Sequence, residues 1–222
     1  GVVPIENSLE GAVTNTLDMF METPLKICSE IFLRVSHNLL SKSDISEIER
    51  IYSHPQVFGQ CRRYLRENLP GVPLVEAAST ARAAARAAEE EKSAALGSSL
   101  AASIYGLDIV TRNIEDSAGN ITRFLVIGKK IPGVSGKDRT SILFSLAHRA
   151  GSLYDALGVF QRRGINLTRI ESRPFKTRAW EYYFFVDFEG HCRSRKIKSA
   201  LSELEDICRS IKILGSYPRG EV

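Results

Sequence analysis

The sequence has no apolar run that could cross a lipid bilayer, since its longest runs, such as Tyr182–Val186, fall far short of about 20 residues. The opening residues, GVVPIENS, lack the basic and apolar regions of a secretory signal peptide. The first residue is not Met, so we expect the chain to be part of a longer protein. These absences predict a cytoplasmic protein with no membrane-bound segment.

The four cysteines form no CxxC pair, and no histidine lies beside them at metal-ligand spacing. They are Cys28, Cys61, Cys192 and Cys208. This pattern is typical of reduced, mostly buried thiols. The sequence also has no GxGxxG segment and no P-loop. We therefore expect neither a metal nor an organic cofactor.

The net charge of the chain is also small. The formal net charge is +4, and acidic and basic residues alternate except in a short cluster at Arg193, Arg195, Lys196 and Lys198. A nucleic-acid-binding protein would show a stronger basic stripe with aromatic residues between the charges. The composition, 43% hydrophobic and 25% charged, is ordinary for a globular protein. It excludes nucleic acid as the expected partner and is compatible with a small anionic substrate.

A polar segment without apolar periodicity, residues 129–137, reads as a linker between two regions. In the first region, residues 1–128, short strand patterns alternate with helix patterns, which predicts α/β layers with much parallel sheet. The expected strands are 2–5, 26–35, 50–53, 72–76, 94–97 and 122–128. The expected helices lie near 13–20, over 56–68, from Ser79 or Thr80 to about 91, and over 100–105.

The second region, residues 138–222, shows the order β-α-β-β-α-β of a ferredoxin-like domain. Its expected strands are 141–146, 165–172, 181–188 and 211–217. One helix is expected to begin at Ser152, with that hydroxyl as its cap, and the other covers 195–208.

Six short segments, in order along the chain, resemble prephenate dehydratases with a C-terminal ACT domain. They are PIENS at 4–8, SHPQ with QC at 53–61, STA at 79–81, Asp116 with NITRF at 120–124, GSL at 151–153 and ESRP at 171–174. The resemblance is to the monofunctional type, without the segment that precedes PIEN in that family. It implies a two-lobed, periplasmic-binding-protein-like α/β dehydratase domain, here partial, with its active site between the lobes.

The resemblance implies loss of carbon dioxide and hydroxide from prephenate to give phenylpyruvate, in phenylalanine synthesis. Hydroxide is a poor leaving group, so a donor must meet it in the transition state. Thr122 is our candidate donor. On a strand, Asn120, Thr122 and Phe124 would share a face. The local pattern alone favours an ordinary strand residue at Thr122 and a core residue at Phe124, and it is the resemblance that favours their place in the site.

For the other candidate site residues, the sequence leaves more than one role open. Arg123, a further candidate catalytic residue, would face away from Thr122, and could bind a substrate carboxylate or pair with Asp116. Glu6 and Asn7 are expected to take part in catalysis and Ser8 in substrate binding, at the end of a strand. Gln60 can present a neutral donor from a helix. Ser79 and Thr80 either bind a carboxylate or cap their helix.

The resemblance further implies that L-phenylalanine regulates the enzyme at the interface between ACT domains, in a homodimer or homotetramer. The implied effector residues are Gly151, Ser152, Leu153, Glu171, Ser172, Arg173 and Pro174. Truncation near Lys137 would then remove inhibition and leave turnover. Two rival functions remain, an arogenate dehydratase and a non-catalytic amino-acid sensor.

Overall fold

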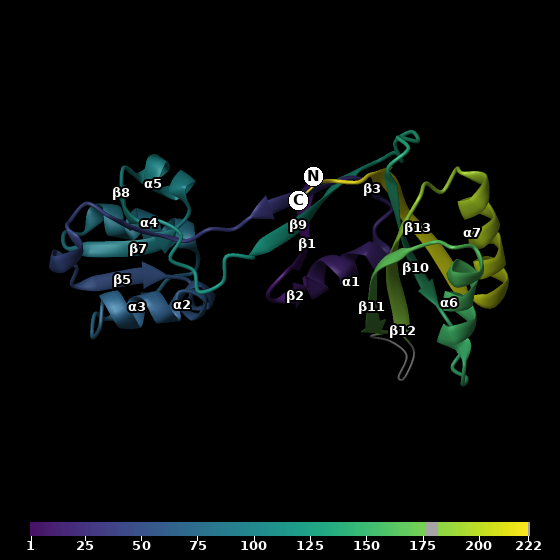
Figure 1. Cartoon of the computed structure of the whole chain (residues 1–222), viewed down its shortest axis with the longest axis horizontal. Helices are drawn as coiled ribbons and strands as arrows, with labels where there is room; N and C mark the ends of the chain where they lie inside the picture. Colours follow the sequence, from purple (N-terminus) through teal and green to yellow (C-terminus); the bar gives the residue numbers. More distant parts are fainter. Residues whose placement is uncertain (176–181, 222) are drawn as a thin grey trace. The chain divides into compact units, whose positions relative to one another are not determined.

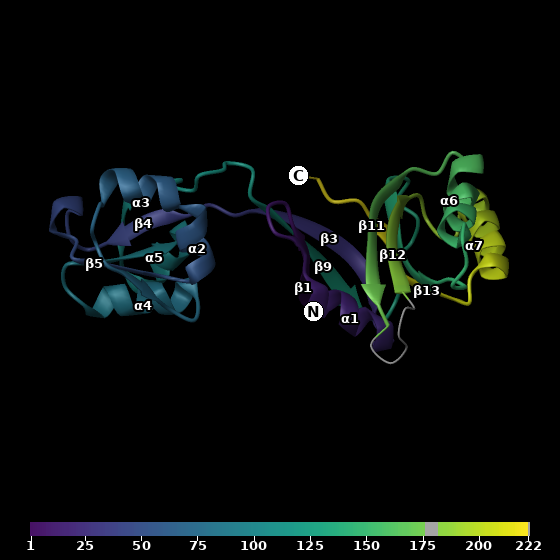
Figure 2. The same ribbon diagram turned by 90° about the horizontal axis from the view of Figure 1, so that it is seen from below.

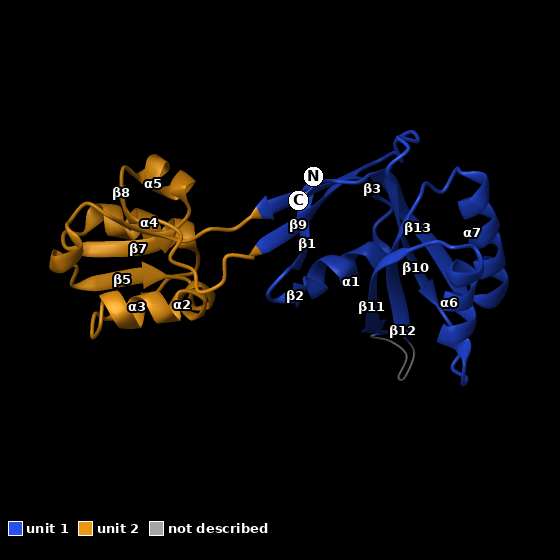
Figure 3. Ribbon diagram, in the orientation of Figure 1, with its two compact units in different colours: residues 1–33, 121–222 blue, residues 34–120 orange. Residues whose placement is uncertain are grey.

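The computed structural model describes residues 1–175 and 182–221. The chain folds as two compact units, each with its own sheet (Figure 3). Unit 1 consists of residues 1–33 and 121–222, and unit 2 consists of residues 34–120. Unit 1 therefore combines the two ends of the predicted dehydratase region with the whole predicted ACT region.

Unit 2 is a five-stranded mixed sheet in the order β6-β5-β7-β4-β8. The strands are β4 (Asn38–Ser41), β5 (Arg50–Ser53), β6 (Leu74–Glu76), β7 (Ser93–Gly97) and β8 (Asp108–Thr111). The helices are η1 (Ile45–Glu47), α2 (Pro55–Gln60), α3 (Arg62–Asn68), α4 (Thr80–Glu89) and α5 (Ser99–Tyr105). Strands β6, β5 and β7 are parallel, as expected where helices connect successive strands.

Helices cover both faces of the unit 2 sheet (Figure 1). Val57, Cys61 and Leu65 of the α2–α3 segment pack on one face, against Ile51 and other strand residues. The alanines of α4 and α5 pack on the opposite face. Because alanine is small, this second helix layer can approach the sheet closely.

Unit 1 has an eight-stranded sheet in the order β11-β12-β10-β13-β3-β9-β1-β2. The strands are β1 (Val2–Asn7), β2 (Gly11–Ala12), β3 (Lys26–Arg34), β9 (Ile121–Gly128), β10 (Asp138–Ser145), β11 (Leu167–Pro174), β12 (Tyr182–Glu189) and β13 (Ser210–Pro218). The helices are α1 (Thr14–Glu22), α6 (Ser152–Arg162) and α7 (Arg195–Ile207). One sheet thus joins strands of both predicted regions.

The join between the regions is the parallel pair of β13 with β3, at Gly215 opposite Ile27. A Cβ atom at residue 215 would lie 2.2 Å from the Ile27 carbonyl oxygen. Only glycine therefore permits this approach of the two backbones.

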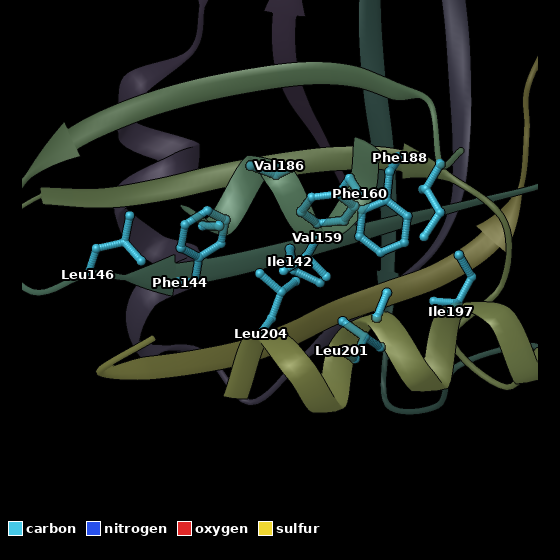
Figure 4. Close-up of a cluster of buried hydrophobic side chains, with 13 residues drawn as sticks. Ile142, Phe144, Leu146, Val159, Phe160, Val186, Phe188, Ile197, Leu201 and Leu204 are labelled. Atoms are coloured by element: carbon cyan, nitrogen blue, oxygen red, sulfur yellow. The ribbon is translucent and has the colours of Figure 1, made fainter. Parts of the chain in front are cut away.

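Two apolar layers lie on opposite faces of the β10–β12–β13 part of this sheet (Figure 2). Alternate residues such as Ile142, Phe144 and Val186 pack under α6 and α7 (Figure 4). Their neighbours Leu143 and Phe185 face α1, with Leu17 and Phe20. This alternation follows from the two-residue period of a strand.

The predicted βαββαβ order over the second region is confirmed by β10, α6, β11, β12, α7 and β13. Glu181, where we predicted a strand to begin, lies outside the described residues. The sequence patterns missed strands β2, β4 and β8. The helix predicted over 56–68 is two helices, α2 and α3, that meet at Cys61. The division of the chain at 129–137 remains a prediction.

The predicted cap at Ser152 is wrong. Gly151 is the N-cap residue, with φ of 84°, and Ser152 is the first residue of α6. The Ser152 hydroxyl donates back to the carbonyl oxygens of Ala147 and Arg149. A left-handed backbone at the cap suits glycine, which explains the residue found there.

None of the helices among the described residues is long and apolar enough to span a membrane. Those residues also hold no cluster of three or more potential metal ligands.

Candidate active site

The first group of predicted site residues lies where β1 and β9 pair in unit 1. The register places Asn7 opposite Thr122 and Glu6 opposite Arg123, after a shift between Pro4 and Glu6. Asn7 Nδ2 donates to Thr122 Oγ1 at 2.9 Å. Since the oxygen of Thr122 accepts from Asn7, its hydroxyl hydrogen can be directed to a ligand.

Ser8 fixes the end of this strand pair. Its backbone N–H donates to the Ile121 carbonyl oxygen, and its Oγ accepts from the Ile121 N–H, both at 2.9 Å. Asn7 Oδ1 accepts from the backbone N–H groups of Leu9 and Glu10, which forms the turn toward β2. Both side chains therefore have defined positions.

A cavity of about 390 Å³ opens beside this turn. Its volume lies within the usual range for small-molecule sites. It is lined by Glu6, Asn7, Ser8, Gly11, Ala12, Phe32, Ile121, Arg123, Arg169 and Glu171. Five of the ten come from the predicted catalytic, substrate-binding and effector residues, and all ten belong to unit 1.

Arg123 faces the opposite side of β9 from Thr122 and lies in a buried ionic network. Its Nε donates to Glu30 at 2.8 Å, its Nη1 to Asp187 at 2.6 Å and its Nη2 to the Tyr217 hydroxyl at 3.1 Å. Arg139 also pairs with Glu30. Burial alone would lower the pKa of Arg123, but Asp187, Tyr217 and Glu30 outweigh it, so its pKa is raised and the group stays charged.

This network settles one alternative. Arg123 does not pair with Asp116, whose carboxylate instead accepts from the backbone N–H of Arg63 at the start of α3. The guanidinium of Arg123 is committed to Glu30, Asp187 and Tyr217, so its geometry favours holding β9 in place over binding substrate. Its predicted catalytic role remains a prediction.

The second group of predicted residues lies in unit 2. The amide oxygen of Gln60, Oε1, is 2.8 Å from His37 Nε2 and accepts from Asn120 Nδ2 at 3.3 Å. Asn120 is buried and precedes β9, so it does not continue the face of Thr122 and Phe124 along that strand. His37 was missed because it lies before the unpredicted strand β4, where no sequence pattern marked it.

Ser79 and Thr80 lie at the start of α4. Ser79 Oγ accepts from the backbone N–H of Arg82 at 3.1 Å, so Ser79 caps this helix. Thr80 is the first residue of the helix. The capping alternative is thus confirmed for Ser79, and carboxylate binding by either residue remains a prediction.

The two expected effector motifs both lie next to the start of β12. Ser152 and Leu153 line a cavity of about 160 Å³ next to Tyr182 and Phe184. The ESRP residues form the end of β11, where half-buried Glu171 and Arg173 alternate with exposed Ser172 and Pro174. Strand β11 pairs Ser172 with Phe184 and Pro174 with Tyr182, the two β12 residues that line this cavity. The joint role of the two motifs stays a prediction.

Comparison with known proteins assigns the family. Residues 1–132 match the family model of prephenate dehydratase, and residues 140–206 match that of the ACT domain. The chain belongs to the prephenate dehydratase family. It is 50% identical to a bifunctional chorismate mutase/prephenate dehydratase of Aquifex aeolicus, over 99% of this chain and 61% of that protein. It is 43% identical to a prephenate dehydratase of Methanocaldococcus jannaschii, over 98% of this chain and 80% of that protein.

Solved structures of this family have the same fold. The prephenate dehydratase of Arthrobacter aurescens, in complex with L-Phe, is 34% identical with a TM-score of 0.89, over 98% of this chain and 74% of that one. GqqA, described as a novel type of quorum quenching acylase, gives the same identity and TM-score, over 98% of this chain and 81% of that one. The chain spans 61% of the length of its Aquifex aeolicus relative.

Proposed function

We propose that the protein containing this chain is a prephenate dehydratase, which converts prephenate to phenylpyruvate. The observation that carries the proposal is the Asn7–Thr122 hydrogen bond, in a chain of this family; Asn7 also lines the unit 1 cavity. The reaction breaks the ring C–O bond and the bond to the departing carboxylate carbon. Carbon dioxide leaves, its bonding electrons enter the ring, and the hydroxide departs as the ring becomes aromatic.

The residues fit distinct parts of this reaction. Asn7 orients the Thr122 hydroxyl by donating to its oxygen, and Thr122 donates its hydrogen to the departing ring hydroxyl. A donor that is already oriented stabilises the developing negative charge without reorganisation in the transition state. Arg123 holds β9 behind Thr122 through its buried partners.

In unit 2, Gln60 supplies an amide whose orientation is fixed by His37 and Asn120. The oriented amide is a neutral polar group for binding the substrate. Ser79 and Thr80 would offer a hydroxyl and backbone N–H groups to a substrate carboxylate.

We also propose that L-phenylalanine is the effector and that the protein is a homodimer or homotetramer through its ACT domains. The ACT match over residues 140–206 and the L-Phe complex of the Arthrobacter aurescens relative support this proposal. A melting temperature raised by L-phenylalanine, together with inhibition of turnover, is the expected result, since a ligand stabilises the state that it binds.

The test of the main proposal is an assay of the purified full-length protein with separate substrates. Phenylpyruvate formed from prephenate supports the proposal. Turnover of arogenate alone would make the protein an arogenate dehydratase. Acylase activity without either dehydration would assign it the function of its neighbour GqqA. Binding of L-phenylalanine without any turnover would indicate that the protein is a non-catalytic amino-acid sensor.

A further inference from the structure

Strand β11 presents two chemically different faces. Residues 167, 169, 171 and 173 are half-buried, and the residues between them are exposed. The half-buried face carries three charged side chains, Arg169, Glu171 and Arg173. Charged residues on the inner face of a strand need partners there. Arg169 finds its partner on β1, which carries Glu6 and Asn7, and Arg173 finds its partner on α1.

The first contact joins Arg169 to Glu6. Arg169 Nε lies 2.6 Å from Glu6 Oε2, and the Arg169 side chain is only 11% exposed. Glu6 immediately precedes Asn7, which donates to Thr122. The ion pair therefore acts on the residue next to the Asn7–Thr122 hydrogen bond.

The second contact joins Arg173 to Asp18 on α1. Arg173 Nε and Nη2 both donate to Asp18 Oδ1 at 3.2 Å. Helix α1 follows β1 and β2 in the chain and packs on the sheet face that carries Leu143 and Phe185. Two points four residues apart on β11 thus hold the segment from β1 to α1.

The backbone of β1 is irregular where Glu6 is held. The ladder with β9 shifts register between Pro4 and Glu6. At such a bulge the backbone ladder alone fixes the strand less well. A side-chain contact to a neighbouring strand therefore has more influence on the position of residues 6–8.

Glu6 also has a second cation within reach, since Arg123 Nη1 lies 3.9 Å from its Oε1. Arg169 keeps one donor, Nη2, buried without a hydrogen-bond partner. The ion pair with Glu6 is thus made through one nitrogen of the Arg169 guanidinium. Glu6 lies between this guanidinium and that of Arg123. A displacement of β11 would weaken the closer pair and let the Glu6 carboxylate move toward Arg123.

We propose that Arg169, a residue of the ACT region, is a positioning residue that sets the place of Glu6 and through it the Asn7–Thr122 pair. Movement of β11 then changes the geometry of the dehydratase residues directly. This inference rests on the proposed function and adds to it a route between the regulatory strand and the reaction.

The test uses Arg169→Gln in the full-length protein, with Arg169→Lys and Arg162→Gln beside it. Misplacement of reacting groups by about 1 Å can cost up to roughly a hundredfold in rate. We expect R169Q to lower kcat by roughly tenfold or more, with KM within about twofold. R169K should recover part of the rate because it keeps the charge without the fork. R162Q removes an exposed ion pair with Glu203 and should leave kcat unchanged.

A cycle with Glu6→Gln separates positioning from general loss of structure. If Arg169 acts through Glu6, the double variant E6Q/R169Q loses no more rate than the worse single variant. Additive losses, or an R169Q rate equal to that of R162Q, would overturn the inference while prephenate turnover by the unchanged protein still stood. Absence of that turnover would instead refute the proposed function, and the inference with it.

Discussion

Units 1 and 2 are stabilised by different kinds of interior. Unit 2 buries small and apolar side chains on both faces of its sheet, including seven alanines that are at most 8% exposed. Unit 1 has apolar layers too, but at its centre it buries the charged residues Glu30, Arg123, Arg139 and Asp187. These four come from four strands, β3, β9, β10 and β12.

The difference indicates which interactions determine the structure of each unit. Apolar contacts tolerate sliding, whereas a buried ion pair requires its partners in one arrangement. The guanidinium of Arg123 can donate to Glu30, Asp187 and Tyr217 together only when strands of both predicted regions are in register. We infer that unit 1 depends on its charges for its geometry and that unit 2 depends on close packing.

The largest expected effect comes from breaking that network. Asp187→Ala removes one of the two carboxylates to which the buried Arg123 guanidinium donates, and also the acceptor of the Ser141 hydroxyl. Removing one member of a buried pair costs about 3–5 kcal/mol. Denaturant unfolding should show that loss for unit 1, ideally with a probe specific to that unit.

Glu203→Ala is the matched control, because this carboxylate pairs with Arg162 and Arg163 on the surface of the same unit. Exposed pairs contribute at most about 1 kcal/mol. Equal losses in the two variants would mean that the buried charges do not distinguish unit 1.

A smaller effect is expected at Ser79 in unit 2. Ser79→Ala removes the cap of α4 and should cost about 1 kcal/mol, since N-caps contribute about 0.5–2 kcal/mol. Ser98→Ala removes the cap of α5 in the same unit, where Ser98 Oγ accepts from the Ala101 N–H. Unfolding should show similar losses for the two variants.

Steady-state kinetics on the same pair separate capping from substrate binding. If Ser79 also binds a carboxylate, S79A raises KM for prephenate and S98A does not. Equal KM values would leave Ser79 as a helix cap alone.

The smallest expected effect concerns Cys61, in the packed interior of unit 2. Burial, followed by the nearby Glu115 and Asp116, raises the pKa of its thiol to about 12 from 9.0. This difference of about 3 lowers the thiolate fraction roughly a thousandfold near pH 8. Alkylation followed by mass spectrometry should modify Cys61 only after unfolding.

The sign of the pH dependence follows from the same shift. The unfolded thiol ionises near pH 9 and the folded one near 12, so the unfolded state is favoured as pH rises above about 9. Rapid modification of Cys61 in the folded protein at pH 8 would show that unit 2 opens readily there.

The sequence was informative where periodicity or a motif marked an element. The βαββαβ order of the second region and the ends of α4 followed from apolar spacing and from Ser79. Strands β4 and β8 were missed, although β4 is fully buried and is as long as β5, which was predicted. In a run of four residues the apolar period is a weak signal. His37 was missed with β4, since its contact with Gln60 joins distant parts of the chain.

The Arg123 network could not be read from the sequence either. Its hydrogen bonds join residues up to 109 positions apart, and each member looks like an ordinary charge or tyrosine in its own strand. The network changes the design of the regulatory test. A truncation near Lys137 would remove Asp187 and Tyr217 and expose Arg123 and Glu30, so point variants in β11 are the better probe.

The central claim is that the Thr122 hydroxyl, oriented by Asn7, assists departure of the ring hydroxyl. Its most direct test is kcat for prephenate in the full-length protein with Thr122→Ala and Thr122→Ser. Loss of one transition-state donor lowers kcat by roughly 10²–10³. The kcat of T122A should therefore fall by that factor with little change in KM. The T122S variant should keep much of the rate, because it keeps the hydroxyl. Near-normal turnover by T122A would contradict the account.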